Sequence, residues 1–398
     1  MKFFVRTFGC KMNLLDTARV VASLREAGHE QVQRAEQADM VLVNTCTVTS
    51  ESERKSRRAV RSAQRDGQRV AVFGCGPRAH GEAWKQAVGG AQICGSEAEL
   101  LSLFGAKPAP RASITTLPTR LLVPIQYGCD NGCTFCATRL ARGAHRTVPR
   151  EEVLETVRAF ADSGGGEVVL SGINLAAWGC SISTHPWESE LASLLTAILE
   201  QTTIERIRLS SLGPEYLDPR FFKVFRDERI CDHLHLSVQS GSFPVLQAMG
   251  RNYTVQDVEE IARQARRVRP DTAITADFIV GFPGETEEYF LQTLELVERV
   301  QFARLHVFPF SPREATAAYS YPDQVSEEDK RRRTSLLTEL GHACSARFHR
   351  SQQGKTVRAL KLADGTSLTS HGLRLRTTTG RQGQWVQVRI EQKDIVSG

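Results

Sequence analysis

Strand and helix signals alternate along most of this chain, and the alternation limits the folds that it can adopt. In the N-terminal part, apolar runs at 3–8, 40–44 and 70–73 are each followed by an amphipathic stretch. A helix between two strands returns the chain to the edge where the first strand began, so the strands pair in parallel. We therefore predict a parallel α/β sheet domain over residues 1–106.

A second alternating series follows residues 107–118, which we predict to be a linker. Pro108, Pro110 and Pro118 disfavour both helix and strand there, because proline lacks a backbone N–H. The runs predicted to be strands are 121–126, 167–170, 206–209, 233–238, 273–280 and 304–308. The helical segments between them include 151–162, 188–201, 255–268 and 287–300. These βα units predict a partial (β/α)6 barrel over residues 119–349, with function expected at the carboxyl ends of its strands.

The C-terminal part changes character. A long charged helix is predicted over roughly residues 326–352, from its periodicity. Short strand signals separated by glycines follow at 356–362, 367–370, 373–378 and 385–390. We predict a small all-β barrel over residues 350–398, which completes an α/β chain of three domains.

Composition narrows the class of protein. The chain has 398 residues and 41% hydrophobic content, enough for two or three ordinary cores. Its apolar runs are shorter than a membrane span, and the apolar start at residues 1–5 is too short for a secretory signal, so we expect a cytoplasmic protein. The formal charge of +6 is compatible with nucleic acid but does not require it. Ten scattered cysteines suit metal ligands better than a disulfide scaffold.

Three of the cysteines lie in one short loop after the first strand of the second series. Cys129, Cys133 and Cys136 are separated by three and then two residues. This spacing offers three thiolates to a cubane iron–sulfur cluster and leaves its fourth iron open for a substrate or cofactor. The alternatives are a zinc knuckle or three chance cysteines. Zinc loops usually carry a second ligand pair, and none follows here.

A second set of cysteines is spread over the N-terminal domain. Cys10, Cys46 and Cys75 each fall at or just beyond the carboxyl end of a predicted parallel strand. Such ends lie along one edge of a sheet, where thiolates from separate turns can converge on a second cluster. The alternative is that each is a small buried residue, and the residues alone leave both possibilities open. Cys94 follows another apolar stretch, and we expect it to be a buried thiol.

The residues around these cysteines resemble a known family. The loop from Tyr127 to Cys136 resembles that of radical S-adenosylmethionine (SAM) enzymes, with Phe135 as the usual aromatic. Phe8-Gly-Cys-Lys-Met-Asn13, Asn44-Thr-Cys-Thr-Val-Thr49 and Gly74-Cys75 resemble the N-terminal domain of the methylthiotransferases. The similarity continues through 170–174, 235–242, 277–286 and 305–310, and the tail resembles an RNA-binding TRAM barrel.

The resemblance implies two [4Fe-4S] clusters, one on Cys129, Cys133 and Cys136 and an auxiliary one on Cys10, Cys46 and Cys75. It also implies two SAM molecules, one as methyl donor and one as source of a 5′-deoxyadenosyl radical. An electron donor such as flavodoxin or ferredoxin would serve as a partner. A non-catalytic iron–sulfur protein that binds RNA is an alternative of a different class.

Within the family, the N-terminal motifs most resemble the branch that acts on N6-threonylcarbamoyladenosine at tRNA position 37. The branch acting on isopentenyladenosine usually has glutamine after its first cysteine, and the ribosomal-protein branch has glycine after its second. This chain has Lys11 and Thr47 at those positions. The anticodon loop of tRNA is therefore the expected partner, with a ribosomal-protein aspartate or isopentenyladenosine tRNA as alternative substrates.

Further site residues follow from the same resemblance and from their places at strand ends. The predicted SAM contacts are Phe135, Ser171, Gly172, Gln239, Ile279 and Gly281. Each has an ordinary alternative, in which a glycine serves a turn and an isoleucine a core. The predicted RNA phosphate contacts are Arg139, Arg142 and Arg146, beside the cluster loop. No catalytic acid–base pair is predicted, since the sequence isolates none.

Overall fold

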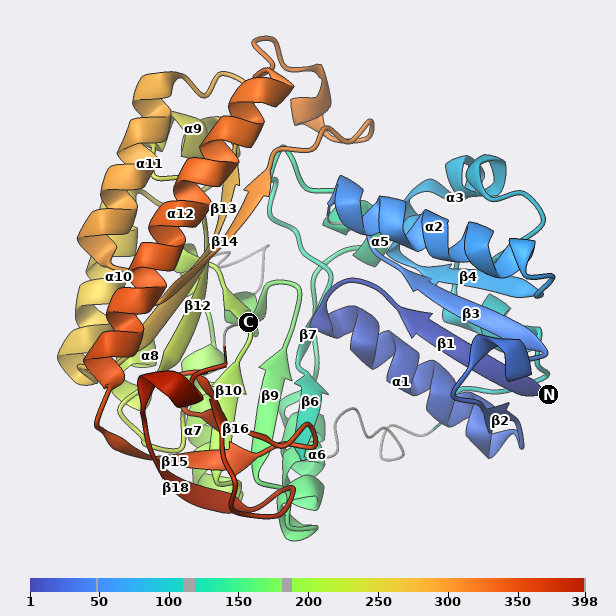
Figure 1. The fold of residues 1–398 in the computed structure, drawn as a ribbon, viewed down its shortest axis with the longest axis horizontal. Helices are drawn as coiled ribbons and strands as arrows, with labels where there is room; N and C mark the ends of the chain where they lie inside the picture. Colours follow the sequence, from blue (N-terminus) through green and yellow to red (C-terminus); the bar gives the residue numbers. More distant parts are fainter. Residues whose placement is uncertain (48, 110–118, 181–187, 397–398) are drawn as a thin grey trace. The chain divides into compact units, whose positions relative to one another are not determined.

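The computed structural model describes residues 1–47, 49–109, 119–180 and 188–396 (Figure 1). Most of the predicted linker, residues 110–118, lies outside the described residues. Contacts divide the chain into two compact units. The described part of unit 1 comprises residues 1–47 and 49–109 together with 127–130 and 136–146, and unit 2 comprises the remainder. None of the described helices has the length and hydropathy needed to cross a membrane.

Unit 1 contains the predicted parallel sheet. Its strands are β1 (Lys2–Thr7), β2 (Glu30–Gln31), β3 (Met40–Thr45), β4 (Val70–Gly74) and β5 (Gln92–Ile93). They pair in the order β2-β1-β3-β4-β5, and every neighbouring pair is parallel. The order reverses direction between β1 and β3, which makes a topological switch point at that edge.

Both faces of this sheet are buried, as expected for a parallel sheet covered by helices. Successive residues of β3 point to opposite sides: Leu42 packs with Phe3 in one apolar core, and Val41 packs with Trp84 in the other. The helices of unit 1 are α1 (Lys11–Glu26), α2 (Ser50–Arg65), α3 (Cys75–Ala87), α4 (Glu97–Ser102) and α5 (Thr138–Arg142).

Unit 2 contains the predicted barrel strands. They are β6 (Arg120–Pro124), β9 (Glu167–Ser171), β10 (Arg206–Leu209), β12 (His233–Gln239), β13 (Ala273–Val280) and β14 (Arg304–Pro309). A short strand that was not predicted, β11 (Ser211–Leu212), follows β10. Two further short strands, β7 (Gln126–Tyr127) and β8 (Arg146–Thr147), flank the cluster loop in sequence. All the barrel pairings are parallel, which confirms the predicted α/β architecture.

The barrel strands form two hydrogen-bonded sheets, β10-β9-β6 and β11-β12-β13-β14. The third strand ends at Leu209, as predicted, and the next residue, Ser210, donates its N–H to the Leu170 carbonyl at 3.0 Å. On one side of this residue the chain pairs with β9, and on the other side Leu212 pairs with Leu236 of β12. One extended segment therefore takes part in both sheets.

Helices cover one side of β12–β14 (Figure 1). The helices of unit 2 are α6 (Arg150–Asp162), α7 (Leu191–Gln201), α8 (Pro219–Val224), α9 (Phe243–Ala248), α10 (Val255–Val268), α11 (Glu287–Val300) and α12 (Glu327–Gln352). Thr254 and Asp257 form a reciprocal capping box at the start of α10, and Thr286 caps α11. These caps explain why both helices begin where the sequence predicted.

The tail is the predicted small all-β domain. Its strands are β15 (Thr356–Lys361), β16 (Thr366–Thr369), β17 (Arg374–Arg376) and β18 (Trp385–Arg389). They form a four-stranded antiparallel sheet in the order β17-β16-β15-β18. The long helix α12 leads directly into this sheet, as its charged periodicity indicated.

A buried charge cluster joins the tail to the start of the barrel strands. Glu167 is fully buried and accepts hydrogen bonds from Arg206 and Arg208, with Arg120 at 3.3 Å. The guanidinium of Arg206 also donates to the Leu368 carbonyl at 3.0 Å. Arg208 likewise donates to the carbonyls of residues 369 and 370. The tail sheet thus supplies acceptors for arginines that a single carboxylate cannot satisfy.

Candidate functional site

The three N-terminal cysteines follow three adjacent strands. Cys10 follows β1 and caps the N-terminus of α1, Cys46 follows β3, and Cys75 is the first residue of α3 after β4. Cys10 and Cys46 therefore flank the switch point between β1 and β3, where ligands bind in open parallel sheets. Two of the three lie at helix N-termini, which favour negatively charged thiolates.

Asn13 holds two of these cysteines together. Its Oδ1 accepts weak hydrogen bonds from Cys75 Sγ at 3.6 Å and from Cys10 Sγ at 3.8 Å. Its Nδ2 donates to the carbonyls of Phe8 at 2.7 Å and Thr45 at 2.8 Å, in the turns that carry Cys10 and Cys46. Asn13 is the last residue of the Phe8–Asn13 motif, but its position in that motif does not indicate this role.

Gly9 explains how closely the loops approach. Its φ is +102°, a conformation that glycine adopts without strain. A Cβ at this position would stand 2.8 Å from Cys46 Sγ, so any larger residue would push the Cys46 side chain away. The structure therefore brings all three predicted auxiliary cysteines to one edge of the sheet.

Arg142 supplies a buried positive charge at this edge. Its side chain is 4% exposed, and it donates to Asp16 Oδ2 at 2.6 Å and to Asn13 Oδ1. The structure does not support the predicted contact of Arg142 with RNA phosphate, because its guanidinium is committed to these internal partners. Its position in sequence, just after the cluster loop, did not reveal which way this long side chain turns.

The electrostatics of Cys75 reflect this surrounding. Burial raises the pKa of the Cys75 thiol to about 11, the positive charge of Arg142 acts to lower it, and Cys10 and Cys46 act to raise it. Three neighbouring thiolates repel one another, so each opposes the ionisation of the others. A cation bound by all three would offset this repulsion. This donor set therefore fits a metal cluster.

The segment after the cluster loop forms hydrogen bonds with two of its cysteines. In unit 1, the Cys129 N–H donates to the Gly143 carbonyl at 3.2 Å, and Cys136 Sγ accepts from the Thr138 N–H at 3.4 Å. Gly128 has φ +65°, and a Cβ there would collide with the Ala144 carbonyl. The loop is thus held against the turn that follows α5.

Cys133 belongs to unit 2, where Arg251 is its partner. Arg251 Nη1 donates to Cys133 Sγ at 3.1 Å, and its side chain is 7% exposed. The same guanidinium pairs with Glu215 at 3.4 Å and contacts Tyr253. Sequence reasoning missed Arg251, because no local motif marks an arginine that reaches a residue more than a hundred positions earlier. N–H donors to sulfur suit a thiolate that ligates iron.

The predicted SAM contacts belong to unit 2, with Phe135 in the cluster loop and the others at or beside strand ends. Phe135 and Ile279 pack against the same apolar cluster, which includes Phe282 and Met249. Gln239 ends β12 with φ +66°, a left-handed conformation that costs a non-glycine residue roughly 1–2 kcal/mol. Strain of this kind concentrates at functional sites, so the outlier supports a role for Gln239.

The remaining predicted SAM contacts have protein neighbours. Ser171 is buried, and its hydroxyl donates to the Val169 carbonyl at 3.2 Å. A Cβ at Gly172 would stand 2.9 Å from Gln126 Oε1, and one at Gly281 would stand 2.4 Å from Lys330 Cγ. Close packing by these side chains explains both glycines without a ligand, so their contacts with SAM stay predictions.

Two of the three arginines predicted to contact RNA lie at the surface. Arg139 and Arg146 are exposed, and the Arg146 guanidinium lies 5.5 Å from the centre of the Tyr127 ring. Cys94 lies in the apolar core of unit 1, which confirms its prediction as a buried thiol. None of the ten cysteines, all within the described part of the chain, forms a disulfide.

Comparison with known proteins shows which family this chain belongs to. Residues 123–297 match the radical SAM superfamily, and residues 2–95 match a family described as uncharacterized protein family UPF0004. The threonylcarbamoyladenosine tRNA methylthiotransferase MtaB of Thermotoga maritima is 34% identical over 376 residues, which cover 89% of this chain and 85% of the relative. The chain belongs to the radical SAM methylthiotransferase family. It is accordingly an enzyme, and its family uses an iron–sulfur cluster and SAM as cofactors.

A second kind of methylthiotransferase is about as similar. The tRNA-2-methylthio-N(6)-dimethylallyladenosine synthase of Syntrophotalea carbinolica is 32% identical over 410 residues, covering 95% of this chain and 91% of that protein. MtaB of Aquifex aeolicus is 31% identical over 417 residues, covering 98% of this chain and all of that protein. Identity alone therefore does not separate the two substrate types.

Solved structures share the fold of this methylthiotransferase. The radical SAM methyltransferase TsrM of Kitasatospora setae, solved with cobalamin and a [4Fe-4S] cluster, has a TM-score of 0.58 at 14% identity. The match covers 80% of this chain and 77% of that one. The cobalamin-dependent radical enzyme OxsB has a TM-score of 0.52 and also 14% identity, covering 86% of this chain and 56% of that one.

Proposed function

We propose that this methylthiotransferase converts N6-threonylcarbamoyladenosine at tRNA position 37 to its 2-methylthio derivative, in the cytoplasm. The observation that carries the proposal is the presence of two separate cysteine sets, each with a buried arginine. One set is Cys129, Cys133 and Cys136, and the other is Cys10, Cys46 and Cys75. We assign a [4Fe-4S] cluster to each set. The choice of substrate is supported by the MtaB relatives and by the N-terminal motifs.

The bound cofactors would supply a carbon-centred radical, a methyl group and sulfur, none of which a side chain can provide. The chain itself orients and insulates them. Arg251 and Arg142 each place a positive charge beside sulfur donors, and each is balanced by one buried carboxylate, Glu215 or Asp16. Phe135 and Ile279 offer an apolar surface for an adenine ring. Electrons would come from a flavodoxin or ferredoxin.

Nucleoside analysis of tRNA tests the reaction and the substrate together. Cells that contain the enzyme should accumulate 2-methylthio-N6-threonylcarbamoyladenosine, and cells without it should retain the unmethylthiolated nucleoside. Mass spectrometry of digested tRNA measures both. Loss of the 2-methylthio isopentenyl nucleoside instead would establish the second candidate, which the dimethylallyladenosine synthase relatives favour.

Two exposed arginines are expected to contact the tRNA backbone. Replacing Arg139 and Arg146 by alanine should weaken tRNA binding and lower the salt slope of log K by about one for each lost phosphate contact. Titrations at several salt concentrations measure the slope. Arg54→Ala on α2 is the matched control, since Arg54 is exposed and pairs with Glu51. An unchanged slope in the double variant would remove this surface from the tRNA site.

Arg251 is expected to tune the cluster at Cys133. A charged N–H donor to sulfur stabilises the reduced, more negative cluster, and Arg251→Met removes this donor. A hydrogen bond to a charged group contributes about 1.5–3 kcal/mol, so the midpoint potential should fall by about 60–130 mV. A redox titration followed by electron paramagnetic resonance measures this. Arg251→Lys, which keeps the charge, should shift the potential less; equal shifts in both variants would contradict the electrostatic explanation.

A further inference from the structure

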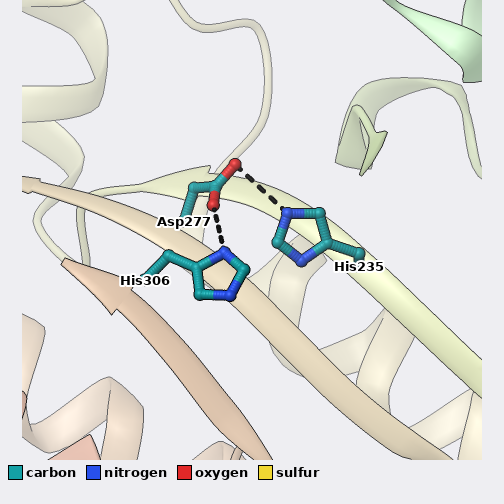
Figure 2. Close-up of side chains that lie close together, drawn as sticks. All are labelled: His235, Asp277 and His306. Carbon is teal, nitrogen blue, oxygen red and sulfur yellow. Dashed lines mark hydrogen bonds and ion pairs between the residues drawn. The ribbon is translucent and has the colours of Figure 1, made fainter. Parts of the chain in front are cut away.

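Three polar side chains in unit 2 form a cluster that the proposed cysteine sites do not use. Asp277 accepts from His235 Nε2 at 3.2 Å through one carboxylate oxygen and from His306 Nδ1 at 3.1 Å through the other (Figure 2). Burial acts to raise the pKa of Asp277, but the two histidines outweigh it and hold the pKa well below its ordinary value. The carboxylate is therefore ionised and bonded to both imidazoles.

The cluster lies on the open face of the β12–β14 sheet. Leu305 points toward α12, where a Cβ on Gly341 would contact it, so the next residue, His306, points to the other face. Asp277 pairs with His306 in the register between β13 and β14. Ile279, the proposed adenine contact, lies two residues further along β13 on the same face. At about 3.3 Å per residue, the cluster is about 7 Å below that contact.

The hydrogen bonds fix which ring nitrogens remain available. An ionised carboxylate only accepts, so both imidazole nitrogens that face Asp277 must carry hydrogen. His235 Nδ1 is engaged by the Thr275 hydroxyl at 2.8 Å. The second nitrogen of His306, Nε2, has no such contact among the described residues, and this side chain is 42% exposed. His306 Nε2 therefore faces the open side of the sheet.

We propose that the His235–Asp277–His306 cluster binds the polar N6 substituent of the substrate base, with His306 Nε2 as the contacting atom. This deepens the proposed function and rests on it. Carbon 2 of adenine, where sulfur enters, and the N6 substituent both flank N1 on one edge of the base. A base whose carbon 2 faces the SAM site thus projects its substituent to a neighbouring position.

The chemistry of the cluster selects one kind of substituent. A threonylcarbamoyl group carries a carboxylate, a hydroxyl and amide N–H groups. His306 Nε2 can donate to the carboxylate when the ring is protonated, or accept from a hydroxyl or N–H when it is neutral. An isopentenyl group is a hydrocarbon, and packing it here would strip water from the ionised cluster without replacing those hydrogen bonds. The cluster therefore favours the threonylcarbamoyl substrate.

Two isosteric variants test the contacting atom. His306→Gln places an amide near the position of Nε2, whereas His306→Asn places one near Nδ1 and keeps only the bond to Asp277. Reconstituted full-length enzyme is assayed on tRNA carrying threonylcarbamoyladenosine, isopentenyladenosine or plain adenosine. We expect kcat/KM for the threonylcarbamoyl substrate to fall roughly ten- to a hundredfold in His306→Asn and less in His306→Gln. His342→Ala, an exposed histidine on α12, is the control.

The outcomes separate the two levels of the proposal. If wild-type enzyme methylthiolates only the isopentenyl substrate, the proposed function fails. If wild-type enzyme uses the threonylcarbamoyl substrate but His306→Asn has an unchanged kcat/KM for it, the substituent site fails alone. The same conclusion follows if His306→Asn retains a higher kcat/KM than His306→Gln. His235, Asp277 and His306 each offer one atom that could bind a metal ion, and these atoms lie within 4.8 Å of one another. A stoichiometric zinc or manganese ion that is lost in His306→Asn would make this a metal site and overturn the proposal.

Discussion

Replacing Cys10, Cys46 and Cys75 by alanine should abolish methylthiolation and leave SAM cleavage in place. The three thiols share one edge of the N-terminal sheet, and Cys133 with its partner Arg251 belongs to the other unit. Anaerobic reconstitution should give about eight irons per chain in the wild type, if both clusters are cubanes, and about four in the variant. Iron analysis, 5′-deoxyadenosine formation and nucleoside mass spectrometry measure the three quantities.

Cys94→Ala is the matched control for that experiment. It also removes a buried thiol from unit 1, but this thiol lies in the apolar core. The control should keep its full iron content and its methylthiolation. If the triple variant lost 5′-deoxyadenosine formation as well, the division of labour between the two cysteine sets would be wrong.

Glu167→Gln should lower the free energy of unfolding by about 3–5 kcal/mol, because it leaves the buried Arg206 and Arg208 without their counter-ion. Denaturant titration measures the change. Glu205→Gln is the matched control, since Glu205 pairs with Arg358 at the surface, where both side chains are nearly half exposed. An exposed pair contributes less than about 1 kcal/mol. Similar losses in both variants would show that the buried cluster contributes no more than a surface pair.

Acid should loosen the same cluster. Burial acts to raise the pKa of Glu167, but Arg208 and Arg206 outweigh it and lower the pKa to about 2, from an ordinary value of 4.5. A depressed pKa stabilises the fold fully above pH 4.5, and this stabilisation is lost as the pH falls from 4.5 to 2. Hydrogen exchange at the tail amides should rise in that window. Glu167→Gln should lack this acid dependence.

The sequence predicted regular elements best where local signals agree with packing. The bounds of α10 and α11 follow from their threonine caps and apolar periodicity. The strand predicted over 206–209 is observed, but the short strand β11 after Ser210 was not predicted, because only the neighbouring strands decide how these residues pair. Such pairing is a property of the sheet, which no local pattern contains.

The sites were predictable to the same extent. Strand ends predicted that Cys10, Cys46 and Cys75 share one edge of the sheet, because parallel topology brings such ends together. The role of both cysteine sets as cluster ligands stays a prediction. The contacts of Arg142, Arg251 and His306 depend on the direction of long or rotatable side chains, which is set by partners distant in sequence. The basic residues near Arg142 in sequence suggested that its side chain lies in solvent and contacts phosphate. In the structure it instead pairs with the buried Asp16.

Unit 1 is built from segments that are distant in sequence, and this affects the order in which its parts are synthesised. Its helix α5 and the Arg142 guanidinium come from residues beyond β6, the first barrel strand. During synthesis, the N-terminal sheet is exposed before this piece exists, and Asp16 then has Arg78, at 3.7 Å, but not yet Arg142, at 2.6 Å, as a salt-bridge partner. A fragment ending in the linker would stay in that unfinished state. The region that holds Cys10, Cys46 and Cys75 is therefore complete only when residues 136–146 belong to the same chain.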